Sequence, residues 1–250
     1  MTSKPNLLEQ IRIVLCQTSH PGNIGAAARA MKTMGLSQLM LVKPKSFPHA
    51  DAVAMASGAS DILESAQISE TLAEALHGTT LAIGMSARRR ELSHELVSAR
   101  IGVQRAISTA HHAPVAIVFG TEMSGLSNEE LGHCQLLAMI PANPEYSSLN
   151  LAAAVQVISY ELRMAALDNP QPAGLEAVPL AASEDVERFY SHLEQVLVEI
   201  GFLNPAQPKR LMQRLRRLYG RTKLEKEEVN ILRGILSATQ APRPPEPPSS

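Results

Sequence analysis

The sequence is poor in the residues that mark several specialised protein classes. It has no tryptophan, 3% aromatic residues and two cysteines among its 250 residues. Proteins that hold single-stranded nucleic acid by base stacking need exposed aromatic rings, so this composition argues against that class. Both cysteines, Cys16 and Cys134, lie within apolar runs, and we expect two buried thiols in place of a disulfide or a metal site.

Long apolar runs and a large charge of one sign are also missing. No run approaches the ~18 apolar residues of a membrane-spanning helix, and residues 1–6 lack the apolar core of a signal peptide. We therefore expect a cytoplasmic protein that does not associate with membranes. The formal net charge is −1, so any surface that binds nucleic acid has to be local.

Several site signatures do not occur in the sequence either. There is no Gly-x-Gly-x-x-Gly pattern, which disfavours a dinucleotide site of the Rossmann type. There is no Gly-x-Ser-x-Gly nucleophile elbow and no Gly-x-x-x-x-Gly-Lys-Ser/Thr phosphate loop. The histidines are scattered without the spacing of metal ligands, so we predict no metal site.

What the sequence does contain, from residue 11 to residue 167, is an alternation of short apolar runs and helical patterns. The runs predict strands at residues 11–16, 38–42, 79–85, 114–119 and 134–140, and the patterns between them predict helices at 22–34, 51–56, 71–76, 101–110, 127–131 and from 148 onward. Continuously apolar strands of this kind indicate a parallel sheet with helices on both faces, so the predicted fold class is α/β.

Composition divides the rest of the chain. Residues 168–182 are rich in proline, glycine and polar residues and are predicted to be a linker. Apolar stripes at helical spacing follow, which predicts a small helical domain at 183–240. Residues 241–250 are rich in proline and poor in apolar residues, and we expect them to be disordered. The first domain is accordingly placed at residues 1–167.

Two segments combine small and polar residues beside predicted strands. Residues 23–29 are Asn-Ile-Gly-Ala-Ala-Ala-Arg, in which Asn23 can cap a helix and Arg29 lies further along it. Residues 119–126 are Phe-Gly-Thr-Glu-Met-Ser-Gly-Leu, with Glu122 between two glycines. Open α/β sheets bind ligands at the carboxyl ends of their strands. Taken singly, each segment is equally compatible with an ordinary capped helix or glycine loop.

A third segment, residues 140–150, joins the last predicted strand to a helix. Pro141 and Pro144 make it irregular, because each lacks an N–H and restricts the residue before it. Ser147 or Ser148 can cap the helix that follows. A rigid loop that runs into a helix start is a frequent ligand site, although this segment by itself is better explained as an ordinary connection.

Basic residues gather at two places. Arg88 and the two arginines after it follow a predicted strand, where they could meet phosphates, although such a run is more often a solvated loop. Further on, a helix carries a single-signed basic face whose members lie within about 60° of each other at helical spacing. These members are Arg210, Arg214, Arg217 and Arg221. No acidic residue interrupts residues 205–223, so we predict a phosphate-binding face.

The three polar segments together resemble the three motifs of the SPOUT RNA 2′-O-methyltransferases, in order and in spacing. They are Asn23-x-Gly-x-x-x-Arg29, Phe119-Gly-x-Glu122-x-x-Gly-Leu and Ile140-Pro…Tyr146-Ser-Ser-Leu-Asn150-Leu-Ala. Further details, such as Thr18-Ser-His-Pro-Gly-Asn-Ile-Gly and Leu232-Arg-Gly-Ile-Leu, are similar to the bacterial TrmJ type of that superfamily. The resemblance extends from about residue 11 to residue 236.

The resemblance implies a deep trefoil knot in the C-terminal part of the sheet, a homodimer, and a tRNA substrate. It implies S-adenosylmethionine as the methyl donor, S-adenosylhomocysteine as the product and no metal in the chemistry. The implied target is the ribose 2′-hydroxyl of the cytidine or uridine at position 32 of the anticodon loop. Matched by position, the cofactor would contact Met85, Ser86, Ala87, Gly120, Ile140, Ser147, Ser148 and Leu149. The catalytic positions are occupied by Asn23, Arg29, Glu122, Ser148 and Asn150.

The chemistry that the resemblance implies suits these residues. A sulfonium methyl is already activated, so catalysis needs in-line positioning and removal of the hydroxyl proton. Because an arginine side chain does not lose its proton in proteins, we expect Arg29 to stabilise the developing alkoxide or to hold a phosphate. Two positions depart from the TrmJ pattern: relatives usually have Arg where this chain has Thr121, and often Thr where it has Met85.

Two alternatives remain open from the sequence. One is an enzyme of the same fold that acts on another tRNA site or on ribosomal RNA, and the other is an RNA-binding protein without catalysis. The TrmJ-like helical extension argues against the first alternative. The intact set of catalytic positions argues against the second.

Overall fold

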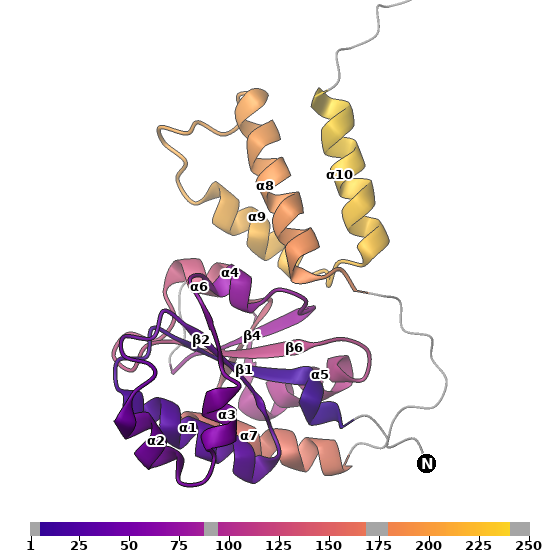
Figure 1. The fold of residues 1–250 in the computed structure, drawn as a ribbon. Helices are drawn as coiled ribbons and strands as arrows, with labels where there is room; N and C mark the ends of the chain where they lie inside the picture. Colours follow the sequence, from indigo (N-terminus) through magenta and orange to yellow (C-terminus); the bar gives the residue numbers. More distant parts are fainter. Residues whose placement is uncertain (1–5, 88–94, 169–179, 241–250) are drawn as a thin grey trace, which may run out of the picture.

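The computed structural model describes residues 6–87, 95–168 and 180–240, so Arg88, most of the predicted linker and the C-terminal tail lie outside the described residues. The strands are β1 (Ile11–Cys16), β2 (Gln38–Val42), β3 (Gln67–Ser69), β4 (Leu81–Met85), β5 (Leu96–Ser98), β6 (Val115–Phe119) and β7 (Leu136–Met139) (Figure 1). The helices are η1 (Leu7–Gln10), α1 (Pro21–Met34), α2 (Ala50–Ala56), α3 (Ser60–Glu64), α4 (Leu72–Ala75), α5 (Ala99–Ala110), α6 (Asn128–Gly132), α7 (Leu151–Asp168), α8 (Ser183–Glu199), α9 (Leu211–Gly220) and α10 (Lys226–Gln240).

The strands form one seven-stranded sheet in the order β3-β2-β1-β6-β4-β7-β5. Every recorded pairing is parallel, for example Ile13 with Leu39 in β2 and with Ile117 in β6. The predicted α/β class with a parallel sheet is therefore confirmed. Because all strands run the same way, the segments that follow β4, β6 and β7 leave the sheet at one common edge.

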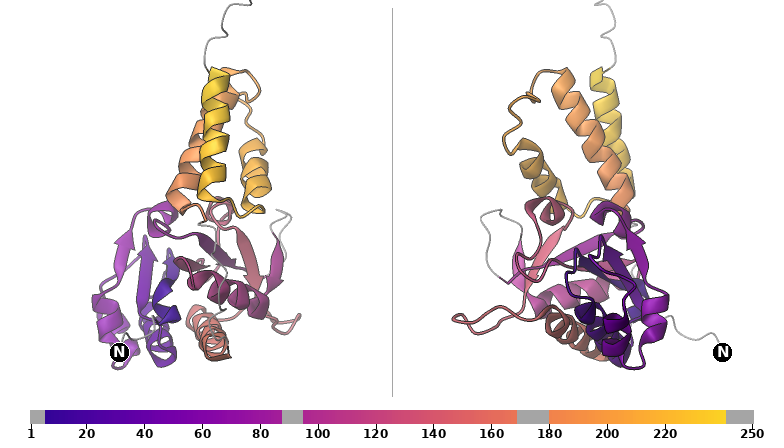
Figure 2. Two further views of the ribbon diagram at one scale, coloured as in Figure 1. Left: turned by 90° about the vertical axis from the view of Figure 1, so that its right-hand side faces the viewer. Right: turned by 60° about the vertical axis from the view of Figure 1, so that its left-hand side comes forward.

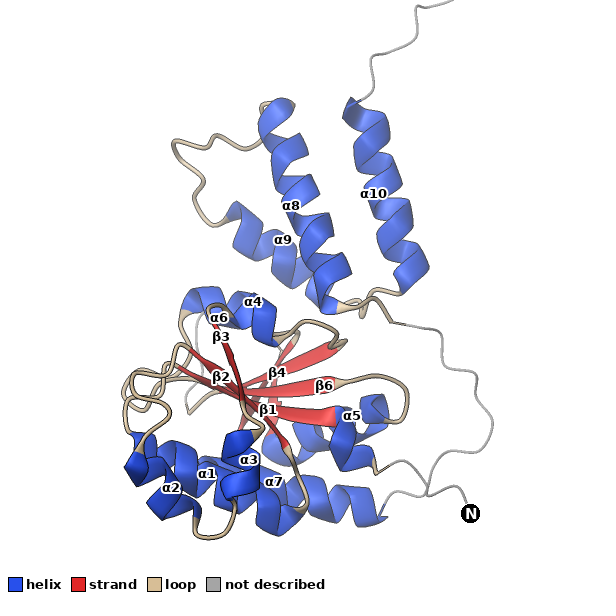
Figure 3. Ribbon diagram, in the orientation of Figure 1, coloured by secondary structure: helices blue, strands red, loops and turns tan. Residues whose placement is uncertain are grey.

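Helices cover both faces of the sheet, as the apolar strands require (Figure 3). Alternate residues of β1 point to opposite sides: Ile13 and Leu15 pack with α1, α5 and α7, whereas Val14 and Cys16 pack with α4 and α6. The same alternation in the neighbouring strands divides the buried residues into two layers. Burial of this continuous apolar surface is the main source of stability in the body of the molecule.

The helical region after residue 183 has its own apolar core. Phe189, Tyr190, Leu193 and Val196 of α8 pack with buried residues of α10, and the ring of Phe189 meets that of Tyr219 edge-on with centroids 4.9 Å apart. Figure 2 shows α8, α9 and α10 standing at one end of the sheet body in both views. We call α8, α9 and α10 the extension; its definition as a separate domain stays a prediction.

Two helix starts differ from the sequence-based expectation. Helix α1 begins at Pro21, so Asn23 lies inside the first turn and does not cap the helix. The amide side chain of Asn150, and not Ser147 or Ser148, caps α7, because its Oδ1 accepts hydrogen bonds from the N–H groups of Ala152 and Ala153. Both predicted caps were wrong for the same reason. The residue type shows only that a side chain is able to cap a helix, whereas tertiary contacts determine which residue does so.

Four short elements were not predicted: η1, α3, β3 and β5. Each contains five residues or fewer, which is too short for a periodic pattern to stand out. The trefoil knot stays a prediction, because strand order and register do not define how the chain is threaded. Among the described residues, no helix is long and apolar enough to span a bilayer.

Candidate functional site

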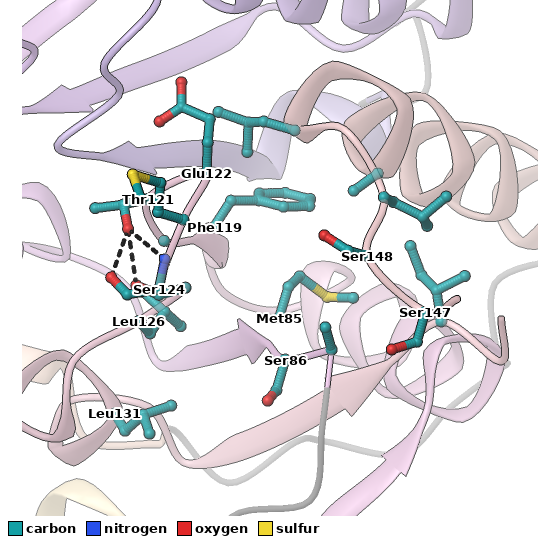
Figure 4. A pocket seen from close by; sticks show the side chains of 18 residues that line it. Met85, Ser86, Phe119, Thr121, Glu122, Ser124, Leu126, Leu131, Ser147 and Ser148 are labelled. Atoms are coloured by element: carbon teal, nitrogen blue, oxygen red, sulfur yellow. Dashed lines mark hydrogen bonds between the residues drawn. The ribbon is translucent and has the colours of Figure 1, made fainter. Parts of the chain in front are cut away.

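A cavity of about 390 Å³ opens at the edge of the sheet where β4 and β6 end. Its walls come from the residues after β4, the loop at residues 119–126, the residues after β7 and the start of α7 (Figure 4). The three motif-bearing segments of the chain contribute unequally, since the first segment, residues 23–29, does not line this cavity. We call this cavity the sheet-edge pocket.

All eight residues predicted to contact a cofactor line the sheet-edge pocket: Met85, Ser86, Ala87, Gly120, Ile140, Ser147, Ser148 and Leu149. In Figure 4, Ser147 and Ser148 lie across the cavity from Met85 and Phe119. The backbone joins the walls as well, because the N–H of Ser86 donates to the carbonyl of Ala138 at 2.9 Å. The structure thus brings the predicted set together, and the assignment of these residues to a cofactor stays a prediction.

Gly120 is required by the shape of the loop that follows β6. A Cβ at this position would lie 2.1 Å from the backbone of Gly125 and Leu126, which no side chain tolerates. The loop therefore folds back directly onto Gly120. Gly125 has a φ of +69°, a conformation that glycine adopts at low cost.

Thr121 closes the same loop from within. Its hydroxyl lies 2.8 Å from the Ser124 hydroxyl and accepts from the Ser124 N–H at 3.2 Å, and its carbonyl accepts from the Gly125 N–H at 3.0 Å (Figure 4). An arginine at this position would offer no such short hydroxyl. Thr121 thus stabilises the loop by contacts within it.

One chain of hydrogen bonds connects all three motif-bearing segments. The Asn150 amide donates to Oδ1 of Asn23 at 3.0 Å, and the Asn23 amide donates to Oε1 of Glu122 at 3.0 Å. Asn23 is 99 positions from Glu122 and 127 positions from Asn150 in sequence, and the three residues come from α1, the loop after β6 and the start of α7. The side chains of Asn23, Glu122 and Asn150 therefore form one network, which we call the Asn–Glu–Asn network.

Glu122 anchors the Asn–Glu–Asn network to the backbone. Its carboxylate accepts from the N–H of Ser19 at 3.0 Å and from the N–H of His20 at 3.2 Å. In Figure 4 the carboxylate points away from the cavity, although the residue lines its rim. Partial burial raises the pKa of Glu122, but the hydrogen bonds from Asn23, Ser19 and His20 lower it by more, so the net direction is downward. Glu122 is accordingly ionised at neutral pH and is a poor proton acceptor.

Arg29 does not join the other predicted catalytic residues. It is exposed on α1, and it is not among the residues that line the sheet-edge pocket. Helix α1 meets α2 closely at Gly25, where a Cβ would lie 2.0 Å from the carbonyl oxygen of Ala52. The small residues of the first motif therefore serve the packing of α1 against α2.

The basic face of α9 is only partly as predicted. Arg210, Arg214 and Arg221 are exposed, whereas Arg217 is half-buried. Arg210 and Arg214 line a shallow groove of about 480 Å³ together with Lys209 and the exposed ring of Phe202. We call this the α9 groove. Residues 200–224 contain no acid, so the groove is positive.

The two cysteines lie away from this chemistry. Both are free and buried, as predicted. Burial raises the pKa of the Cys134 thiol to about 12 and raises the pKa of Cys16 as well, so neither supplies a thiolate at neutral pH. Among the described residues, no group of His, Cys, Asp and Glu has the arrangement of a metal site.

Sequence reasoning missed several residues of the pocket. Its apolar wall comes from Phe119, Leu126, Leu131, Leu151 and Ala154. Leu126 was named as the end of the segment at residues 119–126, whereas the other four were assigned to strands and helices by apolar patterns, which do not distinguish a core position from a pocket wall. The backbone donors of Ser19 and His20 were missed too, because a backbone N–H carries no sequence signal.

Comparison with known proteins gives two family matches and several full-length relatives. Residues 10–160 match the SpoU rRNA Methylase family, and residues 184–248 match the family described as tRNA methyltransferase TrmJ, C-terminal domain. The tRNA (cytidine/uridine/adenosine-2′-O-)-methyltransferase TrmJ of Pseudomonas aeruginosa is 52% identical over 247 residues, which cover 94% of this chain and 95% of that protein. The tRNA (cytidine/uridine-2′-O-)-methyltransferase TrmJ of Cronobacter sakazakii is 52% identical, with 96% of this chain and 100% of that protein covered. The crystal structure of TrmJ from Z. mobilis ZM4 superposes with a TM-score of 0.83 at 31% identity, and covers 92% of this chain and 99% of its own.

Proposed function

This chain belongs to the SpoU rRNA methylase family, as a tRNA 2′-O-methyltransferase of the bacterial TrmJ type, and on that premise we propose that it methylates the ribose 2′-oxygen at position 32 of the tRNA anticodon loop with S-adenosylmethionine as donor. The observation that carries the proposal is the Asn–Glu–Asn network beside a pocket lined by all eight predicted cofactor residues. The Asn–Glu–Asn network gives a rigid polar edge, and the sheet-edge pocket gives a concave site of the size that small ligands occupy.

The pocket fits the chemistry of the proposed donor. Its wall at Phe119, Leu126 and Leu131 is apolar, which suits the faces of a purine. Ser147 and Ser148 line the pocket, and their hydroxyls suit the polar groups of a nucleoside and an amino acid. When bound, the donor would supply a methyl group that needs no further activation. The residues of the chain then have to bind, orient and exclude water.

The Asn–Glu–Asn network is suited to orientation. Glu122 holds Asn23, and Asn23 holds Asn150, whose other amide hydrogen remains available for a ligand. Because Glu122 is ionised and already accepts from Ser19, His20 and Asn23, we assign it to fixing this edge and not to taking the hydroxyl proton. Ser148 lines the pocket two residues before Asn150, so we propose that it contacts the donor or the ribose.

Arg29 leads us to propose that the active unit is a homodimer. One face of α7 exposes Val157, Tyr160 and Met164 at spacings of three and four residues, an apolar stripe that a second copy could cover. Arg29 lies on α1, which packs beside α7, and it is outside the pocket of its own chain. In a dimer built on α7, Arg29 of one subunit could reach the substrate bound at the other.

Mixed dimers test this arrangement. Arg29→Ala and Asn150→Ala proteins, each inactive alone, should regain activity when equal amounts exchange subunits at random, to about a quarter of wild type per site, since about half of the dimers are then mixed and one of their two sites works. The reason is that one pocket of the mixed dimer then has both an intact Asn150 and an intact Arg29 from its neighbour. Absence of any recovery, with exchange verified by mass, would place Arg29 and Asn150 in the same subunit's site.

For the RNA we propose that the basic face of α9 binds phosphates and that the α9 groove takes part. Arg210 and Arg214 supply the charge, and Phe202, exposed by 67%, offers a ring on which an unpaired base can stack. In the right-hand view of Figure 2 the segment between α8 and α9 projects to the same side as the loop that precedes α7. One anticodon arm could therefore touch both.

Methyl transfer to unmodified tRNA tests the function. Purified protein, a tRNA transcript and S-adenosylmethionine should yield a 2′-O-methylated nucleoside on digestion and mass spectrometry, and an excess of chelator should not prevent it. Methyl groups found on a base would exclude the reaction type. A 2′-O-methyl group found only in ribosomal RNA would favour the alternative enzyme of the same fold, and tight tRNA binding without any transfer would favour a non-catalytic protein.

A further inference from the structure

Arg216 does not belong to the basic face of α9 but to a half-buried contact between the extension and the body. Its two terminal nitrogens donate to the two oxygens of Glu187 on α8, at 2.6 and 2.7 Å. Its guanidinium also lies over the ring of Tyr190, 4.5 Å from the centroid, and its carbonyl accepts from the Tyr190 hydroxyl at 3.0 Å. A forked pair with a stacked ring is the most rigid arrangement that an arginine offers.

The same carboxylate reaches the body of the molecule. Nδ1 of His133 lies 3.3 Å from Oε1 of Glu187, and the side chain of Arg216 passes against Gly132. His133 and Gly132 form the end of α6. We call the contact between Glu187, Arg216 and His133 the α6 latch. The side chains of all three are at most 29% exposed, so solvent weakens their attraction less than it weakens a surface pair.

The α6 latch adjoins a wall of the sheet-edge pocket. Leu131, two residues before His133, lines the pocket, and α6 follows directly on the loop that Gly120 and Thr121 shape. The start of α6 is fixed by a capping box, in which Ser127 and Glu130 exchange hydrogen bonds. Helix α6 is therefore a short rigid piece with the pocket on one side and the extension on the other.

A second contact fixes the base of α8. Ser183 donates through its N–H and its hydroxyl to the carbonyl of Thr79, both at 2.7 Å, and Glu184 accepts from the N–H of Gly78 at 3.0 Å. Gly78 and Thr79 precede β4, whose end supplies Met85 to the pocket. The extension thus makes polar contacts with the body both at α6 and at the residues before β4, and the two contacts together restrict its rotation more than either one alone.

We propose that Glu187, Arg216 and His133 are positioning residues, which hold the basic face of α9 at a fixed place relative to the sheet-edge pocket and so select the ribose that receives the methyl group. The proposal rests on the proposed function. An RNA bound to α9 can present only the nucleotides that lie at a set distance from it, and that distance is set by the α6 latch. A displacement of about 1 Å between bound groups is enough to cost a large factor in rate.

Glu187→Gln tests the proposal, with Asp185→Asn as its matched control. Asp185 also carries an ion pair on α8, with Arg188, but that pair lies within the helix and does not reach the body. We expect Glu187→Gln to bind S-adenosylmethionine and tRNA within about twofold of wild type, while the single-turnover rate at the preferred ribose falls about tenfold. Methylation should also appear at neighbouring riboses of the anticodon loop, and His133→Gln should shift the site distribution in the same direction. Asp185→Asn should match wild type throughout.

A merely structural role would lower tRNA affinity or stability without changing which ribose is methylated. Unchanged rate and site distribution in Glu187→Gln would overturn the proposal, and so would a loss accounted for by tRNA affinity alone. Amide hydrogen exchange tests the α6 latch independently of methyl transfer. The exchange rate at residues 127–133 should rise in Glu187→Gln and not in Asp185→Asn. If wild type transfers no methyl to tRNA, the proposed function fails by itself, and the exchange result still decides whether the latch exists.

Discussion

The sheet-edge pocket and the basic face of α9 differ in shape and in how they are held in place. The pocket is concave and is walled by segments that the sheet holds in register, and its loop at residues 119–126 is closed by its own hydrogen bonds. The face of α9 is exposed, and none of the residues of this helix is fully buried. Shape is built into the first region, whereas the second depends on charge and on the contacts that place it.

This difference separates what each region can select. A preformed concave site discriminates by fit, so small changes in backbone shape should be severe there. A basic surface attracts phosphates without reading sequence, so its losses should be gradual and should depend on salt. Selection of one ribose then has to come from the geometry between the two regions, which the α6 latch provides. Substitutions in the pocket should therefore be the most damaging, and single contacts on the exposed face the least.

The largest effect is expected from Gly120→Ala in the pocket. The new Cβ would lie 2.1 Å from the backbone of Gly125 and Leu126, so the loop has to move away from the ligand. We expect the affinity for S-adenosylmethionine, measured by calorimetry, to fall by more than about a hundredfold, which corresponds to roughly 3 kcal/mol.

Gly234→Ala is the control for this prediction, because a Cβ on α10 at that position meets no atom within 4 Å. Alanine should leave donor affinity unchanged and should slightly stabilise the helix. Gly120→Ala protein that stays folded by circular dichroism and binds the donor as wild type does would show that the loop at residues 119–126 does not shape the site.

The next largest effect concerns the charge of α9. Replacement of Arg210 and Arg214 together by alanine should weaken tRNA binding by about tenfold to a hundredfold at moderate salt, and leave donor affinity unchanged. The slope of log affinity against log salt should become shallower by roughly 0.7–0.9 for each phosphate that the protein no longer neutralises. Arg233→Ala, which removes an exposed arginine from α10, is the comparison that should change neither quantity. If removal of Arg233 weakened tRNA binding as much as removal of one arginine of α9 does, the effect would come from the overall charge of the protein and not from the basic face.

An intermediate effect is expected from the pH dependence of the latch. Burial raises the pKa of Glu187, but the hydrogen bonds from His133 and Arg216 lower it by more. The resulting pKa is about 2, against an ordinary value of 4.5. A depressed pKa means that the stabilisation is complete above the ordinary value and is lost as pH falls towards 2. It should amount to on the order of 1–3 kcal/mol, after allowance for partial exposure to solvent. Calorimetry of wild type and Glu187→Gln should therefore show a stability gap at pH 6 that closes between about pH 4.5 and pH 2. A gap that is independent of pH in this window would mean that Glu187 is not ionised in the latch.

The smallest effect is expected at Phe202. Loss of one stacked base costs about 1–3 kcal/mol at a full stacking site, and an open groove should give the lower end, a several-fold loss of tRNA affinity. Because the ring carries no charge, Phe202→Ala should leave the salt slope unchanged, in contrast to the arginine variants. Ile231→Ala is matched in exposure, at 63% against 67%, and lies outside the groove, so it should not weaken binding.

The same contrast explains how much could be predicted from the sequence. The strand at 115–119 is continuously apolar and the strand at 11–16 is apolar except for Arg12, because a parallel sheet buries both faces, and this pattern predicted the sheet. The eight cofactor residues were placed by their resemblance to known motifs, and they do meet in one pocket. The resemblance placed Asn23, Glu122 and Asn150 together among the catalytic positions, but the hydrogen bonds that join them were not predicted, because a motif does not contain the contacts between its residues.

Arg216 shows the limit most plainly. It lies in the acid-free basic stretch at residues 205–223, between Arg214 and Arg217, so in the sequence it looks like a further cation of that stretch. Only the packed structure reveals that Glu187 and Tyr190 turn it inwards. A periodic pattern shows which side chains share a face of a helix, but it does not contain the partner that this face will meet.

The most direct test of the account is a comparison of two tRNA molecules that differ by one atom. The first carries an unmodified ribose at position 32 and the second carries deoxyribose there, with all other nucleotides identical. The account predicts a 2′-O-methyl group at position 32 of the first tRNA, mapped by mass spectrometry of its fragments, and no methyl incorporation into the second. Equal incorporation into both, or a methyl group mapped elsewhere with position 32 untouched, would contradict it.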